Sequence, residues 1–532
     1  MKTASKLAAQ WSHVSTQMKR RAACIAFIVV SFLFGKGVAV VRASGGGERV
    51  QSQEASSVVK HLTAPARPDA PWSTPDLRTF SEPLREERPS ELDPQNEYEL
   101  AELIDVAERT NPETKVAWAR AKEAASAVGL AKSEYYPTLA LKASGVWANL
   151  PVPLPVSPNQ ASYLSVEAQE AQAVASLEWV LLDFGRRAGA VGAARERLLA
   201  ANLGFNGRHL EIVFNVQSAF YKLSTIRGRI TVAQAALDSA LKVQEAAEEK
   251  FKHGLATAPD LALARQQAAQ AAFDFEEVNS KERDAQVTLA ESMGILPTSP
   301  IRVADFSRLA LPTNLEERVE KVIDRTLEQR PDLLARVAVL REKEADIRRA
   351  RAAYFPTLSI LGNAGGAYER SQLTFQNDTS TPWVDTKQPT WAVGAVLTWP
   401  LFEGGARKRK LEMARAEREA AQHELEDARD KAISQVWRFY TDTKLAIRRL
   451  EVAAALVDAS EKSYQQTFEG YQNGLTSLVD VLGARRELSG ARYTLLDTRA
   501  TLLESTAALA FASGDLGPRL LNRKPATTNT RP

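Results

Sequence analysis

The sequence of 532 residues contains one cysteine and five histidines, and these shortages exclude several kinds of site. A single thiol, Cys24, cannot form a disulfide within the chain. The histidines lack the spacing of metal ligands and are scattered over the chain: they are His13, His61, His209, His253 and His423. With no catalytic constellation beside them, the sequence predicts no enzyme, no cofactor and no metal site.

The chain also lacks an excess of charge of either sign and a long apolar run in its interior. Lys and Arg number 68 and Asp and Glu 65, which gives a net charge of +3, and the mean hydropathy is −0.27. Nucleic-acid binding needs a concentrated basic face, so no such partner is expected. Without eighteen consecutive apolar residues, no ordinary transmembrane helix is expected in the mature chain.

The N-terminus has the features of an export signal, which we assign to residues 1–43. Lys19-Arg20-Arg21 provides the positive segment, Ala22–Phe34 the apolar core and Val41-Arg42-Ala43 a cleavage site. Cys24 lies near the start of this core, whereas the cysteine of a lipoprotein lies at its end. The mature chain is therefore expected to carry no thiol. An uncleaved N-terminal membrane anchor is the alternative.

The most informative feature that is present is an internal repeat. Asn111-Pro112 recurs as Arg330-Pro331 and Tyr136-Pro137 as Phe355-Pro356, both at a separation of 219 residues. Later landmarks recur at a separation of 220 residues: Leu177-Glu178-Trp179 and Leu397-Thr398-Trp399, Phe251 to Leu255 and Tyr471 to Leu475, and Gly294 and Gly514. The chain therefore contains two copies of one structural unit.

We divide the chain into two repeats, residues 97–310 and 311–516. Residues 44–96 are polar and rich in proline, which is typical of a disordered tether, and residues 517–532 form a polar tail. Strong helix formers dominate three stretches of each repeat, and these predict helices at 97–134, 187–252, 260–293, 316–353, 406–470 and 478–513. The longest would each span about 100 Å, which is typical of antiparallel coiled coils.

Between the first two helices of each repeat the hydrophobic period changes to two, which is typical of β-strands. This pattern predicts four strands of about ten residues, the length of a tilted transmembrane strand. Each strand pair would be joined by an external loop of about twenty residues. An interfacial aromatic girdle is expected near the strand ends, formed by Trp147, Trp179, Tyr368, Trp391 and Trp399. Half-buried strands of a soluble sheet are the alternative.

Four strands cannot close a barrel, and an open edge in hydrocarbon leaves backbone groups unpaired at several kcal/mol each. We therefore expect a homotrimer with a twelve-stranded β-barrel, four strands per protomer. Helices bound every strand pair at its outer ends, so they must leave the barrel on one side. The predicted fold class is an α+β membrane protein in which a long α-helical coiled-coil barrel continues the β-barrel as a conduit.

Over residues 97 to 516 the chain resembles the TolC family of outer membrane efflux proteins. Tyr136-Pro137-Thr138-Leu139 and Phe355-Pro356-Thr357-Leu358 are similar to that family's entries into the barrel. Trp399–Gly405 and its first copy Trp179–Gly185 are similar to its strand-to-helix exits. Tyr471–Val481 is similar to its periplasmic helix turn. The specificity lies in these motifs occurring twice and in order.

The resemblance implies a homotrimeric channel in the outer membrane, with outer-membrane lipid around it and a periplasmic helical extension. Such channels receive substrates from an inner-membrane pump through a periplasmic adaptor. Our first hypothesis is passive export of small toxic compounds in such a tripartite efflux system. The outlet channel of a type I protein secretion system is the alternative within this fold. A periplasmic coiled-coil scaffold without a pore is the alternative outside it.

The resemblance also implies that the turns between the long helices contact the adaptor, although each is in any case a helix–helix turn. The residues concerned are Gly254, Leu255, Gly474, Leu475 and Tyr471. The two glycines are expected to supply positive φ or a close approach of the backbone.

Asp260 and Asp480 follow the two turns at equivalent places. In a trimer each would form a ring of three carboxylates at the narrow end of the tube, and such rings favour cations. In the family, positions like Asp480 line the closed entrance. Capping of the following helix is the simpler role, and the two roles can coexist.

Two departures from the family pattern concern this entrance. Thr476 stands where the best-known gate has an arginine, and Gly483 stands where it has a second acidic ring. Arg265 and Arg485 are equivalent in the two repeats and lie close to the turns. They are therefore candidates to replace the missing arginine, although arginines on helices more commonly face solvent.

Overall fold

The computed structural model describes residues 92–515, except 94, 158–159, 298–300, 305–310, 316 and 376–378. The predicted signal peptide at 1–43, nearly all of the tether at 44–96 and the tail at 517–532 lie outside the described residues.

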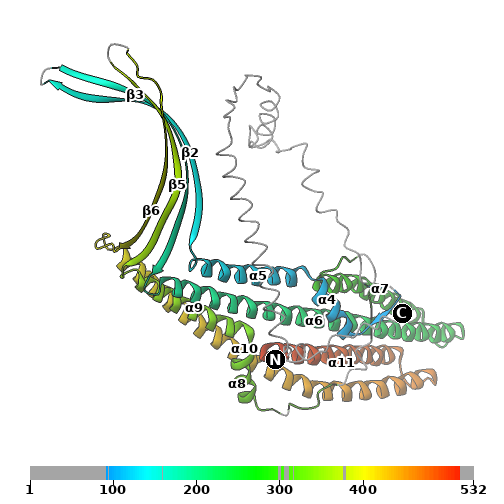
Figure 1. The fold of residues 1–532 in the computed structure, drawn as a ribbon. Helices are drawn as coiled ribbons and strands as arrows, with labels where there is room; N and C mark the ends of the chain where they lie inside the picture. The colour runs from blue at the N-terminus through cyan, green and yellow to red at the C-terminus, as the bar shows by residue number, and fades with distance from the viewer. Residues whose placement is uncertain are drawn as a thin grey trace, which may run out of the picture. The chain divides into compact units, whose positions relative to one another are not determined.

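The described part of the chain has the same order of elements twice: two helices, two long strands and two very long helices (Figure 1). The first copy consists of α4 (Leu100–Thr110), α5 (Pro112–Ser133), β2 (Thr138–Ser157), β3 (Gln160–Leu182), α6 (Arg186–Lys252) and α7 (Ala258–Met293). The second copy consists of α8 (Val319–Gln329), α9 (Pro331–Ala352), β5 (Thr357–Thr374), β6 (Val384–Thr398), α10 (Ala406–Gln472) and α11 (Leu478–Ser513). Two short strands, β1 (Glu97–Tyr98) and β4 (Arg302–Val303), pair in parallel.

The four long helices begin and end within two residues of the predicted bounds. The predictions of single helices at 97–134 and 316–353 are wrong, because each is broken into two. The breaks fall at Asn111-Pro112 and Arg330-Pro331, since the residue before a proline avoids the helical region and proline suits the first helical turn. The Asn111 side chain caps the new helix by accepting a hydrogen bond from the backbone N–H of Glu113, at 2.9 Å.

The four long strands form one antiparallel sheet in the order β2-β3-β5-β6. They contain 20, 23, 18 and 15 residues, so the predicted length of about ten is wrong. The long loop predicted after Leu150 is also wrong, because residues 150–157 continue β2 and pair with β3. The predicted length is that of a membrane-crossing segment, and backbone pairing continues beyond it.

The register places the apolar positions of all four strands on one face of the sheet. Leu139 pairs with Leu177, Leu177 with Gly362, and Gly362 with Val393. Directly opposed residues point to the same face, so the predicted alternation is confirmed. The polar residues between them share the other face and include Lys142, Ser144, Glu170, Ser176, Glu178, Asn363 and Glu369.

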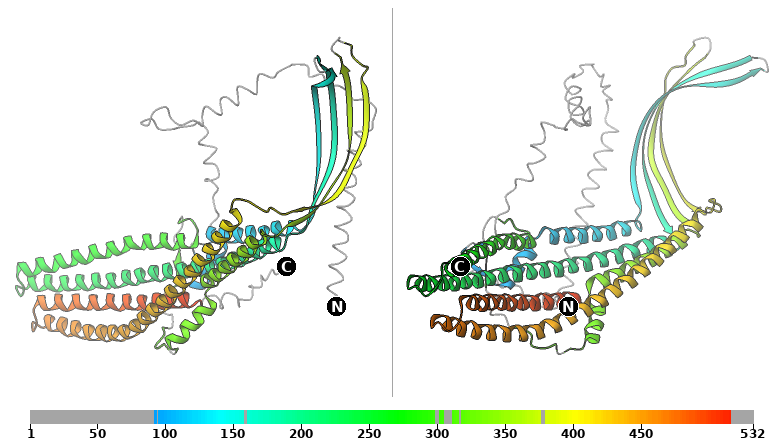
Figure 2. Two further views of the ribbon diagram at one scale, coloured as in Figure 1. Left: turned by 90° about the vertical axis from the view of Figure 1, so that its left-hand side faces the viewer. Right: turned by 180° about the vertical axis from the view of Figure 1, so that it is seen from behind.

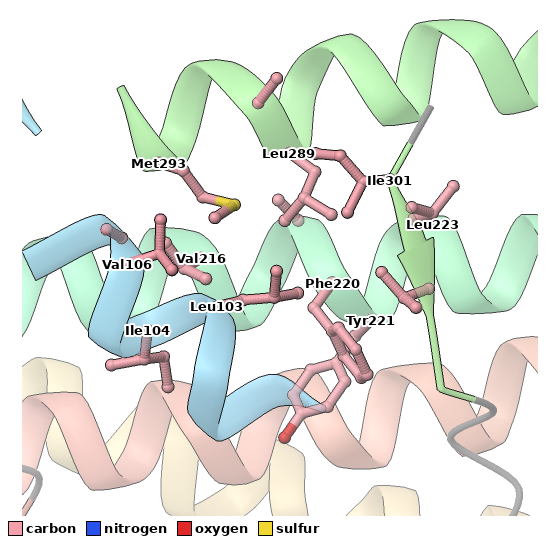
Figure 3. Close-up of a cluster of buried hydrophobic side chains, with 14 of the residues drawn as sticks. Leu103, Ile104, Val106, Val216, Phe220, Tyr221, Leu223, Leu289, Met293 and Ile301 are labelled. Carbon is pink, nitrogen blue, oxygen red and sulfur yellow. The ribbon is translucent and has the colours of Figure 1, made fainter. Parts of the chain in front are cut away.

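The long helices of each repeat form an antiparallel hairpin, and α11 of the second hairpin packs along α6 of the first (Figure 2). Near the turns, Val243 and Ala264 of the first hairpin share a buried cluster with Leu478 and Val481 of the second. A larger cluster lies where α4 covers α6 and α7 (Figure 3), and it includes Leu103, Val106, Val216, Phe220, Leu289 and Met293. None of the helices in the described ranges is both long and apolar enough to cross a membrane.

Candidate functional site

The turns between the long helices have the same backbone structure in both repeats. Gly254 and Gly474 have φ values of 72° and 79°, which residues with a Cβ rarely adopt, so the predicted positive φ is confirmed. The N–H of the next residue donates to the carbonyl oxygen five residues earlier, at 2.8 Å in each turn, and closes the helix end. The side chains of Leu255 and Leu475 are 76% and 81% exposed. Each turn therefore presents an apolar side chain to solvent.

Asp260 and Asp480 both cap the helices that follow the turns. Their backbone N–H groups donate to the hydroxyl oxygens of Thr257 and Ser477, and their carboxylates accept from the N–H and O–H of the same residues. Hydrogen bonds from the side chain and backbone of Thr257 lower the pKa of Asp260, and those from Ser477 lower the pKa of Asp480. Both carboxylates are therefore held in the ionised form.

Tyr471 makes the two turns unequal. It is 5% exposed and packs beneath Lys250 of the first hairpin, whose Nζ lies 4.1 Å from the ring centroid and donates to the Tyr471 carbonyl oxygen. Burial, and then the charge of Asp260, raise the pKa of Tyr471. Its hydroxyl has no hydrogen-bond partner among the described residues. The equivalent Phe251 is 43% exposed and is not part of the buried cluster, so Tyr471 joins the hairpins and Phe251 does not.

The two equivalent arginines have different surroundings. Arg265 is exposed, and its Nε and Nη2 both lie 3.1 Å from Oε1 of Glu248. Arg485 is 8% exposed and donates from Nη1 to the carbonyl oxygen of Ala236 (3.3 Å) and from Nη2 to Oε1 of Gln267 (3.2 Å). Burial lowers the pKa of Arg485. The structure therefore brings Arg485 between the hairpins, without an ion pair among the described residues.

Thr476 stabilises the second turn from within. Its Oγ1 donates to the carbonyl oxygen of Thr467 at 2.8 Å. The approach is close, because a Cβ added to Gly470 would lie 2.9 Å from the Thr476 methyl group. Thr476 thus bonds inside its own turn instead of reaching outward as an arginine could.

The aromatic residues of the predicted girdle occupy two kinds of position. Trp179 and Trp399 lie where the strands meet the helices, and their Nε1 atoms donate to carbonyl oxygens of the preceding segments. Trp147, Tyr368 and Trp391 lie inside the strands instead of near their ends, because the strands are longer than predicted. Trp147 is level with Gln169, ten residues along β3 from Trp179. That separation fits a membrane-crossing strand, and the girdle itself stays a prediction.

A family model described as outer membrane efflux protein matches residues 103–295 and 322–515, one segment in each repeat. The chain belongs to this family. Protein CyaE of Bordetella pertussis is 26% identical over 439 residues, covering 82% of this chain and 88% of CyaE. The solvent efflux pump outer membrane protein SrpC of Pseudomonas putida is 24% identical over 452 residues, covering 81% and 89%. The solved CmeC outer membrane channel of Campylobacter jejuni matches with a TM-score of 0.65 at 20% identity, covering 85% and 94%.

The predicted relationship to TolC-type channels is thus confirmed, as are the α+β fold class and the two-fold repeat. This outer membrane efflux protein is located in the outer membrane, and its solved structural neighbours are trimeric channels with a periplasmic helical extension. Its family and its solved structural neighbours are channel proteins and not enzymes. In the described ranges, no group of three or more His, Cys, Asp or Glu side chains is arranged to hold a metal ion.

A polar network that the sequence did not predict lies where the strands of this efflux protein meet its helices. Asp183 and Arg187 form an ion pair of 2.7 Å, with side chains 7% and 6% exposed. Arg187 also donates to the carbonyl oxygen of Val180 at 2.6 Å. The second copy has the pair Glu403 and Arg407 at 2.9 Å. The sequence does contain a signal for this network. In both repeats an acidic residue precedes an arginine by four positions, with glycine between them.

Proposed function

We propose that this protein is the homotrimeric outer-membrane channel of a tripartite efflux system, through which small toxic compounds leave passively. The observation that carries the proposal is a sheet with one apolar face that meets long helical hairpins at one end. SrpC, a relative along most of its length, is named as the outer membrane protein of a solvent efflux pump, which favours small compounds as cargo.

In this proposal an inner-membrane pump passes its substrates to the channel through a periplasmic adaptor. The adaptor docks at the two turns, where Leu255 and Leu475 offer exposed apolar contacts on backbones fixed by Gly254 and Gly474. The burial of Tyr471 keeps the two turns together as one docking surface.

The entrance of the proposed channel carries Asp480 and Asp260. In a trimer they form two rings of three carboxylates, which are charged at neutral pH, and the lowered pKa of each group extends the charged state to more acidic pH. A charged ring at a narrow entrance attracts cations and excludes anions. Arg485 and Thr476 stabilise the helices and the turn that carry this entrance, since both donate hydrogen bonds to carbonyl oxygens of their own protomer.

Single-channel conductance of the detergent-purified protein in a planar bilayer tests the proposal. We expect pores that conduct without nucleotide and prefer cations, and a reduced cation preference in Asp480→Asn. Asp458→Asn, which alters an exposed aspartate paired with Lys462 on α10, is the matched control and should behave like wild type. Absence of pores would overturn the proposal, and pores that ignore Asp480→Asn would overturn only the entrance assignment.

A further inference from the structure

The two outer strands of the sheet, β2 and β6, each have one edge that pairs with no strand among the described residues. Their apolar side chains are also the most open of the sheet, with Leu139 75% and Trp391 79% exposed. Unpaired backbone N–H and C=O groups cannot be satisfied in hydrocarbon. Each edge must therefore pair with an edge of another chain, and an antiparallel ring requires β6 of one chain to meet β2 of the next.

The repeat supplies a template for this contact. The two strand pairs have the same register, because Leu139 pairs with Leu177 in the first copy and the equivalent Leu358 with Leu397 in the second. The contact between the copies, β3 with β5, is resolved within one chain and places Ser176 opposite Asn363. The missing contact, β6 with β2, also joins a second copy to a first copy.

We propose that β6 pairs with β2 of the partner subunit in the register of β3 with β5. This assignment, which rests on the trimer of the proposed function, places Val396 opposite Ser144 of the partner subunit. It follows from Ser176 and Asn363 by the repeat separations of 220 and 219 residues. The apolar Leu397 then meets Ala143 of the partner subunit on the apolar face of the sheet.

The prolines at the two edges provide an independent argument. Proline has no N–H and is confined to strand edges, and here it occurs at Pro389 in β6 and first at Pro151 in β2. The proposed register places Pro389 opposite Pro151 of the partner subunit. The two positions that lack a backbone N–H donor then face each other, and the remaining pairs keep their donors. The uninterrupted ladder then runs over nine pairs, from Thr398 to Thr390 of β6, which fits a membrane-crossing strand.

A shift of the register by one residue is excluded by the faces of the strands, because it would turn every apolar side chain of one subunit toward the polar face. The competing registers are those shifted by two residues. In these, Val396 would lie opposite Val146 or Lys142 of the partner subunit. Directly opposed residues have Cα atoms about 4.5–5.5 Å apart, within the disulfide range, whereas diagonal neighbours are about 7–8 Å apart.

Disulfide trapping in the full-length protein tests the register, with Cys24 replaced by serine in every variant. The variant Ser144→Cys/Val396→Cys is oxidised with copper phenanthroline in outer membranes and analysed on a denaturing gel without reductant. Because each subunit contributes one thiol to each neighbour, we expect a covalent trimer, at least tenfold more abundant than in the shifted variants. These are Val146→Cys/Val396→Cys and Lys142→Cys/Val396→Cys.

The equivalent pair within one chain, Ser176→Cys/Asn363→Cys, controls for oxidation at this depth and should form a disulfide without linking chains. Covalent trimers from a shifted variant alone would overturn the register while leaving the trimeric channel intact. Absence of covalent trimers from all three variants, with the control oxidised, would overturn the proposed register and both registers shifted by two residues. Conductance of the same preparations tests the proposed function separately. That function predicts pores whether or not the covalent trimer forms, so absence of pores would count against the function and not against the register.

Discussion

Arg485 on α11 donates a hydrogen bond from Nη1 to the carbonyl oxygen of Ala236 on α6, at 3.3 Å, and thereby bridges the two helical hairpins. Its Nε is buried and has no partner among the described residues, and burial lowers its pKa. A lowered pKa of a base means that the folded state disfavours the charged form. Burial therefore disfavours the charge of Arg485, and only its hydrogen bonds to Ala236 and Gln267 oppose that cost.

Replacing Arg485 with methionine should raise stability. Arg485→Met removes a buried cation without an ion pair and retains most of the apolar volume, but it also removes the two hydrogen bonds to Ala236 and Gln267. We expect the relieved desolvation to outweigh these bonds, so the free energy of unfolding should increase by about 1 kcal/mol. Arg265→Met, which breaks the exposed pair with Glu248, should lower the free energy of unfolding only slightly. Urea unfolding in detergent measures both, and a clear loss of stability in Arg485→Met would contradict this account.

Removing the hydroxyl of Ser477 should shift the pH dependence of conduction. In the wild type, hydrogen bonds from Ser477 hold the pKa of Asp480 below its usual range, so the carboxylate stays charged until the pH falls through that lowered value. Ser477→Ala raises the pKa toward the usual value of about 4, so cation preference should be lost at a higher pH. Reversal potentials recorded from pH 7 downward test this. Thr498→Ala, farther along the same helix, should leave the midpoint unchanged.

The junction of strand and helix should be sensitive at Asp183 and tolerant at Glu403. Burial raises the pKa of Asp183, but hydrogen bonds from the backbone and side chain of Arg187 outweigh it, and the net pKa is lowered. The pair therefore stabilises the fold above the usual carboxyl pKa, and this is lost as the pH falls through the lowered value. Asp183→Asn should cost about 3–5 kcal/mol at neutral pH, because it strands a buried arginine.

Glu403→Gln is the matched change in the second repeat, where the carboxylate is 40% exposed. It should cost about 1 kcal/mol or less. Tryptophan fluorescence during urea unfolding at pH 7 compares the two variants. Equal losses would show that burial of the Asp183 pair is not what distinguishes the two junctions.

Charges placed on the exposed leucines of the turns should weaken adaptor binding. Burial of a leucine side chain in a complex contributes about 1.5–3 kcal/mol to the free energy of binding. Leu475→Asp should therefore weaken binding by roughly tenfold or more. Leu255→Asp tests the first turn in the same way. Gln472→Asp, an equal charge change at an exposed position, should weaken binding less than about threefold. Binding of the purified adaptor to immobilised channel gives the comparison, and equal effects of all three would argue against apolar docking.

The sequence predicts the long helices and the strand faces well, because both depend on local periodicity over many residues. It does not predict where the strands end, since Leu150 to Ser157 contain three prolines and resemble a loop, yet these residues continue β2 and pair with β3. The strong helix formers around Asn111 favour one continuous helix, so the break there is not predicted, although Pro112 follows it.

The different surroundings of Arg265 and Arg485 could not be predicted from either helix alone. Arg265 pairs with Glu248 on α6, but the equivalent position on α10 is Phe468, so Arg485 has no acid to pair with. Its neighbours come from α6 and α7 of the other hairpin. Only tertiary packing reveals such a contact, whereas the capping by Asp260 and Asp480 follows from local sequence and was anticipated.

The common register of the two strand pairs bears on how such a chain originated. Under the proposed register the ring has two kinds of strand contact, one within a strand pair and one between neighbouring pairs. A half-length chain with one strand pair could then close the same ring with six identical subunits. Duplication and fusion of its gene would preserve the barrel and lower its symmetry from sixfold to threefold. Two repeats in one chain can carry different turns, as the buried Tyr471 and the exposed Phe251 do at equivalent positions.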